Sequence, residues 1–512
     1  MFCRILSGGV VGVSACFVWV EADIDRGLPS FSMVGSLGSE VRESKERVTV
    51  ALKNAGFSLP AARVTVNLAP ADIHKEGTAF DLPIAVAILQ AMSYFPADNA
   101  EKILFLGELG LDGELKKVRG VLPIVRAAAA EGIAQCIVPS ANAGEGAVIP
   151  GITVRGASHI SQVVEFLQQG DEKAREEILP ALSIDAQSIL NSGNDGNADF
   201  AEIRGQHMGK RAAEIAAAGF HNLLMIGPPG AGKSMIAGRI PGILPSLTLE
   251  ESLEITGIYS VGGLLEKGQA LVTDRPFQNP HHTVSRAALI GGSQRPRPGL
   301  ISLAHRGILF MDELPEFERS VIDSMRQPLE EHKVCLARTG GNVCYPAEFM
   351  LVCAMNPCAC GYFPDKNRCR CTQVQINRYK SKVSGPIMER IDLWVELHAV
   401  DVRNLQGGGG EESTEQIRRR VERARVRQQE RLEGTVYRFN ADIQAADMGK
   451  FCALGEREKH VMEQLYDSLQ LGARGYHRLL KVSRTIADLA GEERIREEHL
   501  LEAAAYRPGE MA

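Results

Sequence analysis

The stretch Asn222-Leu-Leu-Met-Ile-Gly227-Pro-Pro-Gly-Ala-Gly-Lys233-Ser234 decides the fold. Its first five residues are short and mostly apolar, which predicts a buried parallel strand. Its last eight residues fit G-x-x-x-x-G-K-[ST], a pattern in which backbone N–H groups face a phosphate chain. Residues 235–240 are expected to continue as a helix whose N-terminus adds its positive dipole end. The stretch therefore predicts an α/β nucleotide-binding core.

Each residue of this phosphate loop has an expected part. Lys233 can reach the β- and γ-phosphates of ATP, and Ser234 can hold Mg²⁺. The other loop residues present their backbone to the nucleotide: Gly227, Pro228, Pro229, Gly230, Ala231 and Gly232. ATP and Mg²⁺ are therefore the expected cofactors.

Composition sets the broad class of the protein. The chain has 512 residues, of which 45% are hydrophobic and 23% charged, with a formal net charge of −6. This composition is typical of a globular protein of about three domains. No run of 18 apolar residues predicts a transmembrane helix, and the apolar start at residues 10–20 reads as a strand and not as a signal peptide. We expect a cytoplasmic protein without a membrane partner.

Residues 1–167 alternate short strand-like and helix-like segments, which predicts an α/β domain without a phosphate loop of its own. Residues 168–200 are polar and rich in turn-forming residues, so we expect a linker there. The expected helices cover residues 41–54, 81–92 and 121–130, and the expected strands cover residues 63–68, 103–106 and 133–138.

Two acids follow the apolar run Gly307-Ile-Leu-Phe-Met. ATP hydrolysis needs one carboxylate to hold Mg²⁺ and another to polarise the attacking water, and Asp312 and Glu313 fit these two roles. A further strand, expected over residues 349–354, leads to Asn356, which can position the hydrolytic water. The alternative is an asparagine that only turns the chain before Pro357.

Arginines near the C-terminus are candidates for contacts to the γ-phosphate. Arg390 precedes an expected strand and has the position of an arginine finger offered to a neighbouring subunit. The alternative is an ordinary solvated or paired arginine. Residues 454–506 are helical by periodicity, and one arginine of this lid, Arg474 in preference to Arg478, is expected to read the γ-phosphate.

Four cysteines form two C-x-C pairs after Asn356: Cys358, Cys360, Cys369 and Cys371. Four thiolates across a turn can bind a structural Zn²⁺ ion, although this spacing is tighter than the usual C-x₂₋₄-C. Buried free thiols and a redox pair are the alternatives.

The stretch 275–311 holds five arginines and no acid, in a chain that is acidic as a whole. Such a stretch can neutralise a phosphate backbone, so Arg286, Arg295 and Arg297 are the expected DNA contacts. The alternative is that some of its arginines serve ATP or carboxylates of another subunit. The adjacent His281 and His282 have no carboxylate or cysteine beside them, which argues against a metal site.

Two strings near the N-terminus resemble the C-terminal domain of Lon protease: Lys75-Glu-Gly-Thr-Ala79-Phe-Asp-Leu-Pro-Ile-Ala and Gly107-Glu-Leu-Gly-Leu-Asp-Gly-Glu-Leu. That family uses a Ser-Lys dyad. The resemblance places Ala79 at the serine position and Leu122 at the lysine position. Neither residue can act as nucleophile or base, so we expect a Lon-like scaffold without peptidase activity.

The chain as a whole resembles the AAA+ superfamily, and specifically the Mg-chelatase-like branch typified by YifB and ComM. The resemblance is carried by Arg275-Pro-Phe-Gln-Asn-Pro-His-His-Thr283, Leu314-Pro-Glu-Phe317 and Met355-Asn-Pro-Cys-Ala-Cys-Gly361. The domains expected on this basis are a Lon-like α/β domain over 1–167, the linker over 168–200, an AAA+ core with a parallel sheet over 201–400, a connecting segment with a charged helix over 401–453, and a helical lid over 454–512.

The resemblance also implies a homohexameric ring that acts on DNA. Residues 334–345 read as two alternating strands around Thr-Gly-Gly-Asn, which predicts a hairpin between the strand that ends in the two acids and the strand that leads to Asn356. In related hexameric helicases a hairpin at this place projects into the pore and carries a basic residue, and Arg338 matches that residue. The leading expectation is therefore an ATP-driven motor for branch migration or helicase action in DNA recombination or natural transformation. The alternatives are a metal-chelatase motor, which would need a separate porphyrin-binding partner, and an ATP-switched regulator that binds DNA or protein without translocation.

Overall fold

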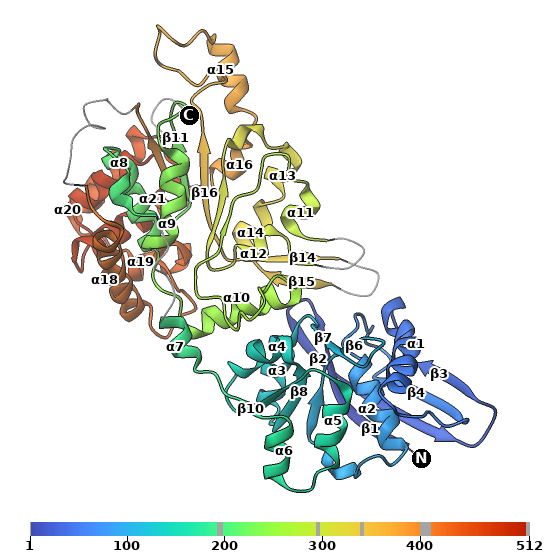
Figure 1. Ribbon diagram of the computed structural model, residues 1–512. Helices are drawn as coiled ribbons and strands as arrows, with labels where there is room; N and C mark the ends of the chain where they lie inside the picture. Colours follow the sequence, from blue (N-terminus) through green and yellow to red (C-terminus); the bar gives the residue numbers. More distant parts are fainter. Residues whose placement is uncertain (1, 192–197, 293–296, 338–341, 400–410, 508–512) are drawn as a thin grey trace.

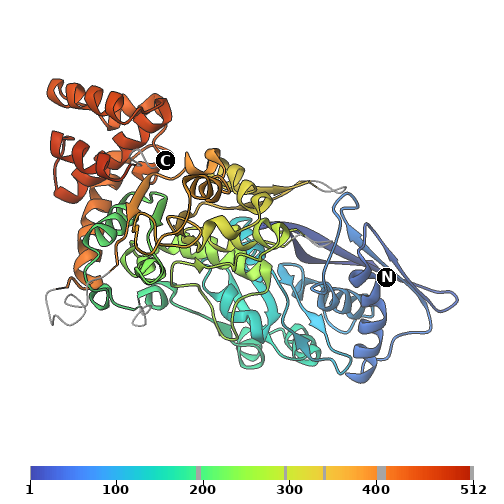
Figure 2. The same cartoon turned by 90° about the horizontal axis from the view of Figure 1, so that it is seen from above.

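The computed structural model describes residues 2–191, 198–292, 297–337, 342–399 and 411–507. An N-terminal α/β domain and a C-terminal group of helices lie at opposite ends of the molecule, with a second α/β unit, the ATPase core, between them (Figures 1 and 2). None of the helices in these ranges is long and apolar enough to cross a membrane. The predicted fold class, an α/β core with a helical C-terminal part, is confirmed.

A mixed sheet in the order β10-β9-β8-β5-β1-β2-β4-β3 organises the N-terminal domain. The apolar start of the chain forms two antiparallel strands where the sequence predicted one, because Gly12 turns the chain with a positive φ of 65°. The strands of this sheet are β1 (Phe2–Val11), β2 (Ser14–Asp25), β3 (Ser30–Val34), β4 (Arg63–Ala69), β5 (Ile103–Phe105), β8 (Gln135–Pro139), β9 (Thr153–Ala157) and β10 (Ala181–Leu182). Two short strands, β6 (Glu108–Leu109) and β7 (Leu115–Lys116), pair with each other outside it.

The helices of this domain cover both faces of its sheet (Figure 1). They are α1 (Ser39–Asn54), α2 (Asp81–Ala91), α3 (Val121–Ala130), α4 (Ser140–Ala147), α5 (Ile160–Gln168), α6 (Glu172–Ile178) and α7 (Ala186–Asn191). Every residue of α2 is buried, as a sequence that is apolar except for Asp81 and Gln90 requires. Residues 168–200, expected as a linker, contain α6, β10 and α7, and β10 pairs antiparallel with β9 at the edge of the sheet.

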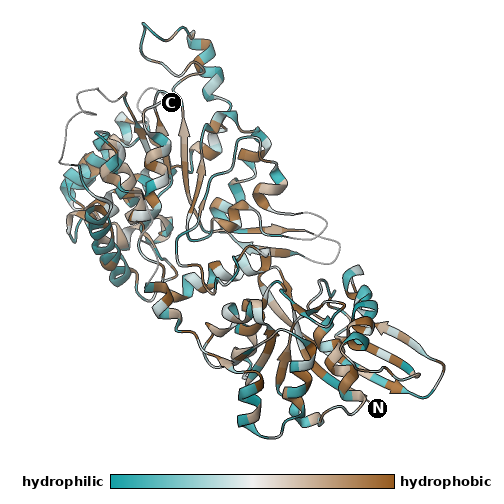
Figure 3. Cartoon of the chain, viewed as in Figure 1, coloured by the Kyte–Doolittle hydropathy of each residue, from teal (hydrophilic) through white to brown (hydrophobic). Residues whose placement is uncertain are grey.

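The ATPase core has a parallel sheet in the order β12-β13-β16-β11-β17. Its strands are almost wholly apolar, as expected for a sheet covered on both faces (Figure 3). They are β11 (Leu223–Ile226), β12 (Phe277–Gln278), β13 (Ile308–Met311), β16 (Met350–Met355) and β17 (Leu393–Glu396). Between β13 and β16 the chain forms a separate hairpin, β14 (Lys333–Leu336) and β15 (Val343–Pro346), in which a disulfide joins Cys335 and Cys344.

Helices of the core and of the C-terminal part share one buried apolar cluster on one face of this sheet. The helices of the core are α8 (His207–Gly219), α9 (Lys233–Ile243), α10 (Leu249–Gly262), α11 (Arg286–Ile290), α12 (Leu300–Leu303), α13 (Arg319–Asp323), α14 (Arg326–Glu331), α15 (Gln373–Lys380) and α16 (Gly385–Met388). The C-terminal helices are α18 (Thr414–Leu432), α19 (Met448–Phe451), α20 (Glu456–Ser468), α21 (Ala473–Ala490) and α22 (Glu497–Ala505). The predicted charged helix over 414–432 is α18.

Helix α10 joins the core to the N-terminal domain (Figure 1). Leu253 of α10 belongs to the same buried apolar cluster as Leu122 of α3. A Cβ on Gly257 of α10 would lie 3.8 Å from the Leu122 side chain. Leu122, the position expected to match the Lon lysine, is therefore enclosed by the neighbouring domain.

The polar side of α10 is tied to two arginines of the stretch 275–311. Arg275 donates to Glu251 at 3.2 Å, and Arg306 donates to Glu254 at 3.0 Å, with both arginines buried. Burial would by itself raise the pKa of Glu254, but His305 and Arg306 lower it to about 2. Two of the five arginines in the stretch 275–311 are thus buried in ion pairs. The sequence grouped them into a basic patch because their acidic partners lie outside that stretch.

We predict that Leu122→Lys destabilises the N-terminal domain by about 3 kcal/mol or more, because it places an ammonium group among apolar side chains without a partner. Urea unfolding followed by the fluorescence of Trp19 on β2 would measure this. The control Leu122→Met keeps the volume and should cost less than about 1.5 kcal/mol. Equal stability of Leu122→Lys and the wild type would contradict the enclosure of this position.

Candidate nucleotide site

The phosphate loop runs from β11 into α9, and its glycines are required by its geometry. Gly230 and Gly232 take φ values of 79° and 87°, in the left-handed region that favours glycine. Gly227 lies against the backbone after β17, where a Cβ would come within 2.6 Å of the Leu397 carbonyl oxygen. The sequence pattern and the backbone therefore agree at all three glycines.

Lys233 connects this loop to the end of the neighbouring strand. Its Nζ donates hydrogen bonds to the carbonyl oxygens of Gly227 and Pro228, at 2.6 and 3.0 Å, and to Oδ1 of Asn356 at 3.1 Å. Burial lowers the pKa of Lys233, and the charges of Asp312 and Glu313 oppose this shift. A negatively charged phosphate bound beside this half-buried ammonium would also raise its pKa and so favour its charged form, as the two acids do.

Ser234 and the two acids lie at the same edge of the sheet. Oγ of Ser234 donates to Oδ2 of Asp312 at 2.7 Å, so two oxygen atoms of the kind that Mg²⁺ prefers are already together. The backbone N–H of Glu313 donates to the other carboxylate oxygen of Asp312 at 2.9 Å. Glu313 itself has a positive φ of 52°, an uncommon conformation that costs about 1–3 kcal/mol and is typical of functional positions.

His282 is a site residue that the sequence reasoning missed. Its Nδ1 lies 3.8 Å from Oε2 of Glu313, and its ring packs on His281 with the centroids 4.1 Å apart. The sequence placed this pair in the basic stretch 275–311 and argued against a metal site, but it gave His282 no part at the catalytic acids. The pairing of β12 with β13 brings the loop after β12 beside the acids, and the string Asn-Pro-His-His-Thr in that loop was the available signal.

Arg390 and Arg474 lie together at the opposite end of the strands. Both line a cavity of about 410 Å³, which also includes Arg478 and Asn222. Asn222 precedes β11 whereas Lys233 follows it, and a strand of this length spans about 13 Å. The structure therefore brings the two predicted arginines to each other and not to the phosphate loop of the same chain.

Acidic neighbours hold these arginines in place. Arg390 pairs with Glu330, and Arg474 donates to Glu389 at 2.9 Å with most of its side chain exposed. Arg478 is more buried, lies 3.9 Å from Asp392, and has its pKa lowered by burial. Of the two lid candidates, Arg474 is thus the more exposed.

The expected DNA contacts are only partly described. Arg286 begins α11 and is exposed, and Arg297 is exposed as well. Arg295 and Arg338 lie outside the described residues. The four sulfur atoms of Cys358, Cys360, Cys369 and Cys371 are brought together, all within 4.8 Å of one another.

A phosphate loop, paired acids and a strand-end asparagine on a parallel sheet of this order, with helices at the C-terminal end, define an AAA+ ATPase. The family described as magnesium chelatase, subunit ChlI, matches residues 199–405. The families described as subunit ChlI of Mg-chelatase and as magnesium chelatase, subunit ChlI C-terminal, match residues 20–142 and 411–507. The chain belongs to the YifB/ComM family of Mg-chelatase-like AAA+ proteins.

Similarity to members of this family extends over nearly the whole chain. Competence protein ComM of Haemophilus influenzae is 41% identical over 505 residues, which cover 98% of this chain and 97% of that protein. YifB of Escherichia coli is 40% identical over 501 residues, covering 97% and 95%. The magnesium-chelatase 38 kDa subunit of Cereibacter sphaeroides is 27% identical over 175 residues, covering 31% of this chain and 52% of that subunit.

We predict that Glu313→Gln binds ATP as tightly as the wild type but hydrolyses it about 10²- to 10⁴-fold more slowly, because Asp312 still holds Mg²⁺ while the base for water is lost. Nucleotide binding and phosphate release would be measured together. Glu316→Gln, which changes an exposed acid nearby, is the matched control and should keep its activity. Near-normal turnover by Glu313→Gln would remove this residue from the catalytic assignment.

Proposed function

We propose that this chain is a ring-forming cytoplasmic ATPase that couples ATP hydrolysis to DNA remodelling, through branch migration or helicase action in recombination or natural transformation. Its proposed cofactors are ATP and Mg²⁺, with a structural Zn²⁺ on the four cysteines. The observation that carries the proposal is the separation of Lys233, at one end of the strands, from Arg390 and Arg474 at the other end. Neither the end of the strands with Lys233 nor the end with Arg390 and Arg474 is by itself a complete catalytic site.

A ring would complete the site between subunits. The phosphate loop and the acids supply the binding of MgATP and the activation of water, but nothing in them neutralises the outer face of the γ-phosphate. Arg390 and Arg474 of the next subunit can supply that charge if the edge that carries them packs against the phosphate-loop edge. Repetition of one such head-to-tail contact closes a ring, for which we propose six subunits.

Three features support DNA as the substrate. Arg286 and Arg297 are exposed in a stretch without acids, and they can pair with phosphates of a nucleic acid backbone. His282 comes a few residues before Arg286 and contacts Glu313, so DNA binding at α11 has a short path to the catalytic acid. A competence protein is also among the relatives that match over nearly the full length. We propose Arg295 and Arg338 as further DNA contacts.

A metal-chelatase motor is the second candidate, and the match to the ChlI families favours it. The ATP site would serve either role, because both need the same cycle of binding and hydrolysis. An ATP-switched regulator that does not translocate is a third reading of the same site. Stimulation of the ATPase by DNA separates the DNA motor and the DNA-binding regulator from the chelatase. Movement of DNA strands then separates the motor from the regulator.

Chains with Arg390→Ala mixed with chains with Lys233→Ala should regain activity that neither has alone. In a random mixture about a quarter of the interfaces join an intact Lys233 to an intact neighbouring Arg390, which sets the expected recovery relative to wild type. Steady-state ATP hydrolysis of the mixture measures it. Mixing either variant with the double variant provides the control, which should stay inactive. If mixed rings assemble but stay inactive, Arg390 does not act on the neighbouring site.

Forked or single-stranded DNA should stimulate ATP hydrolysis, and Arg286→Ala and Arg297→Ala should each weaken DNA binding and lower its salt dependence by about one phosphate contact. Binding at several salt concentrations and branch-migration assays would test this. Arg319→Ala, which removes an exposed arginine outside the stretch, is the control. A wild-type protein that neither binds DNA nor responds to it would defeat the DNA proposal and leave the ATPase site untouched.

A further inference from the structure

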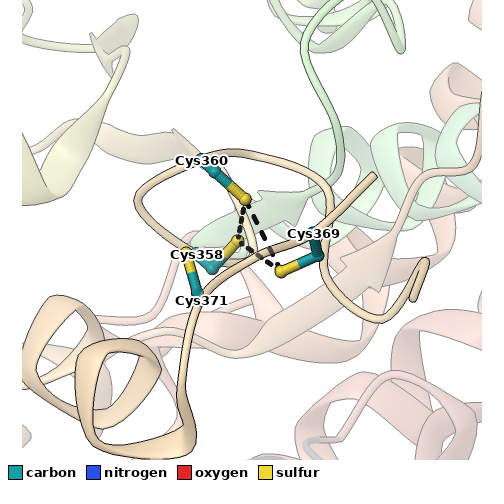
Figure 4. A group of neighbouring side chains, drawn as sticks. All are labelled: Cys358, Cys360, Cys369 and Cys371. Atoms are coloured by element: carbon teal, nitrogen blue, oxygen red, sulfur yellow. Dashed lines mark hydrogen bonds between the residues drawn. The ribbon is translucent and has the colours of Figure 1, made fainter. Parts of the chain in front are cut away.

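The four cysteines after Asn356 are arranged as the corners of a metal site (Figure 4). The sulfur of Cys358 lies 3.3 Å from that of Cys360 and 3.8 Å from that of Cys369, and the Cys360 and Cys369 sulfurs are 3.5 Å apart. In a tetrahedral site with Zn–S bonds of about 2.3 Å, adjacent sulfurs are about 3.8 Å apart. The cluster is thus already close to the size that a Zn²⁺ ion requires.

The loop that carries these sulfurs has no apolar core of its own. None of the side chains from Tyr362 to Cys371 is buried. Backbone hydrogen bonds from Asp365 to Tyr362 and from Cys369 to Asp365, each 2.8 Å, close the turn but do not attach it to the rest of the core. A short segment that cannot bury apolar surface needs a cross-link or a metal to stay in one conformation.

This loop, which we call the cysteine loop (residues 358–371), contacts the catalytic centre. A Cβ on Gly361 would lie 2.7 Å from the ring of Pro229 in the phosphate loop and 3.8 Å from the side chain of Asn356. At the other end, Cys371 directly precedes Thr372, the N-cap of α15. The sulfurs therefore tie together the end of β16, a contact to the phosphate loop and the start of α15.

The segment between the two cysteine pairs also forms one wall of a cavity of about 490 Å³. Gly227 and Pro228 of the phosphate loop line this cavity, and so do Tyr362 and Arg368, whose guanidinium lies 3.9 Å from the centre of the Tyr362 ring. Trp394 of β17 lines it as well. The wall of this cavity on the side of the cysteine loop lies between the two cysteine pairs, so the sulfur cluster fixes both of its ends.

We propose that Cys358, Cys360, Cys369 and Cys371 bind one Zn²⁺ ion that holds the cysteine loop against Pro229 and Asn356, so that nucleotide binding depends on the bound zinc. The metal is structural, since four protein thiolates fill a tetrahedral coordination shell and leave no open position for water. The dependence of nucleotide binding on zinc rests on the proposed ATPase function, whereas zinc binding itself does not.

Metal analysis of the full chain, purified without chelators, tests whether the four cysteines bind zinc. We expect about one zinc per chain. The variant Cys369→Ser with Cys371→Ser should lose it, and these two positions are chosen because they are farther from Asn356 in the sequence than the other pair and are only half-buried. The control Cys16→Ser removes a half-buried thiol of the N-terminal domain and should keep the zinc. A wild-type protein with no zinc, with iron in its place, or with these four cysteines in disulfides would overturn the metal site.

Binding of a non-hydrolysable ATP analogue, followed by the fluorescence of Trp394, tests whether nucleotide binding depends on the zinc. The dissociation constant should rise about tenfold in the double serine variant and stay unchanged in Cys16→Ser. Removing zinc from the wild type with a chelator should reproduce the loss, and adding zinc back should reverse it. Loss of zinc without a change in affinity would refute the link between the two. Failure of the zinc-loaded wild type to bind nucleotide would refute the ATPase function and leave the metal site standing.

Discussion

The register of three neighbouring parallel strands is the constraint on which the catalytic site depends. Ile226 of β11 pairs with Met355 of β16, so the phosphate loop and Asn356 leave the sheet side by side. Met311 of β13 pairs with Cys353, which brings Asp312 to the same edge. Because adjacent strands are about 4.8 Å apart, the next residues along each strand come within hydrogen-bonding reach. A slip by one residue would exchange the two faces of a strand and break the contacts of Lys233.

Most of this edge could be predicted from the sequence, because its information is local. Short apolar runs that end in Gly227, Asp312 and Asn356 identify strands and the polar groups at their ends without knowledge of the tertiary fold. The helices over residues 121–130 and 414–432 were predicted with the bounds that the structure gives them, since their periodicity and their end signals agree. The zinc hypothesis came from spacing alone, and the structure adds that the four sulfurs converge.

What the sequence could not give depends on contacts between distant segments. Arg275 and Arg306 looked like part of a DNA-binding patch, but Glu251 and Glu254 of α10 bury them in ion pairs. The same helix encloses Leu122. The turn at Gly12 lies against Cys344 of the β14–β15 hairpin, so the N-terminal domain contacts both α10 and that hairpin. Arg474 likewise lies near Arg390 because of how α21 packs against the core, and the apolar periodicity of a helix does not predict which segments it will contact.

The central claim is that one chain holds two incomplete halves of an ATPase site and that a neighbour completes it. The most direct test is the ATPase rate per chain measured over a range of protein concentrations, with the assembly state determined at each one. We predict a rate close to zero for monomers that rises in step with ring formation, because in the proposed ring Arg390 and Arg474 reach a nucleotide only across an interface. A rate per chain that is the same for monomers and rings would contradict it.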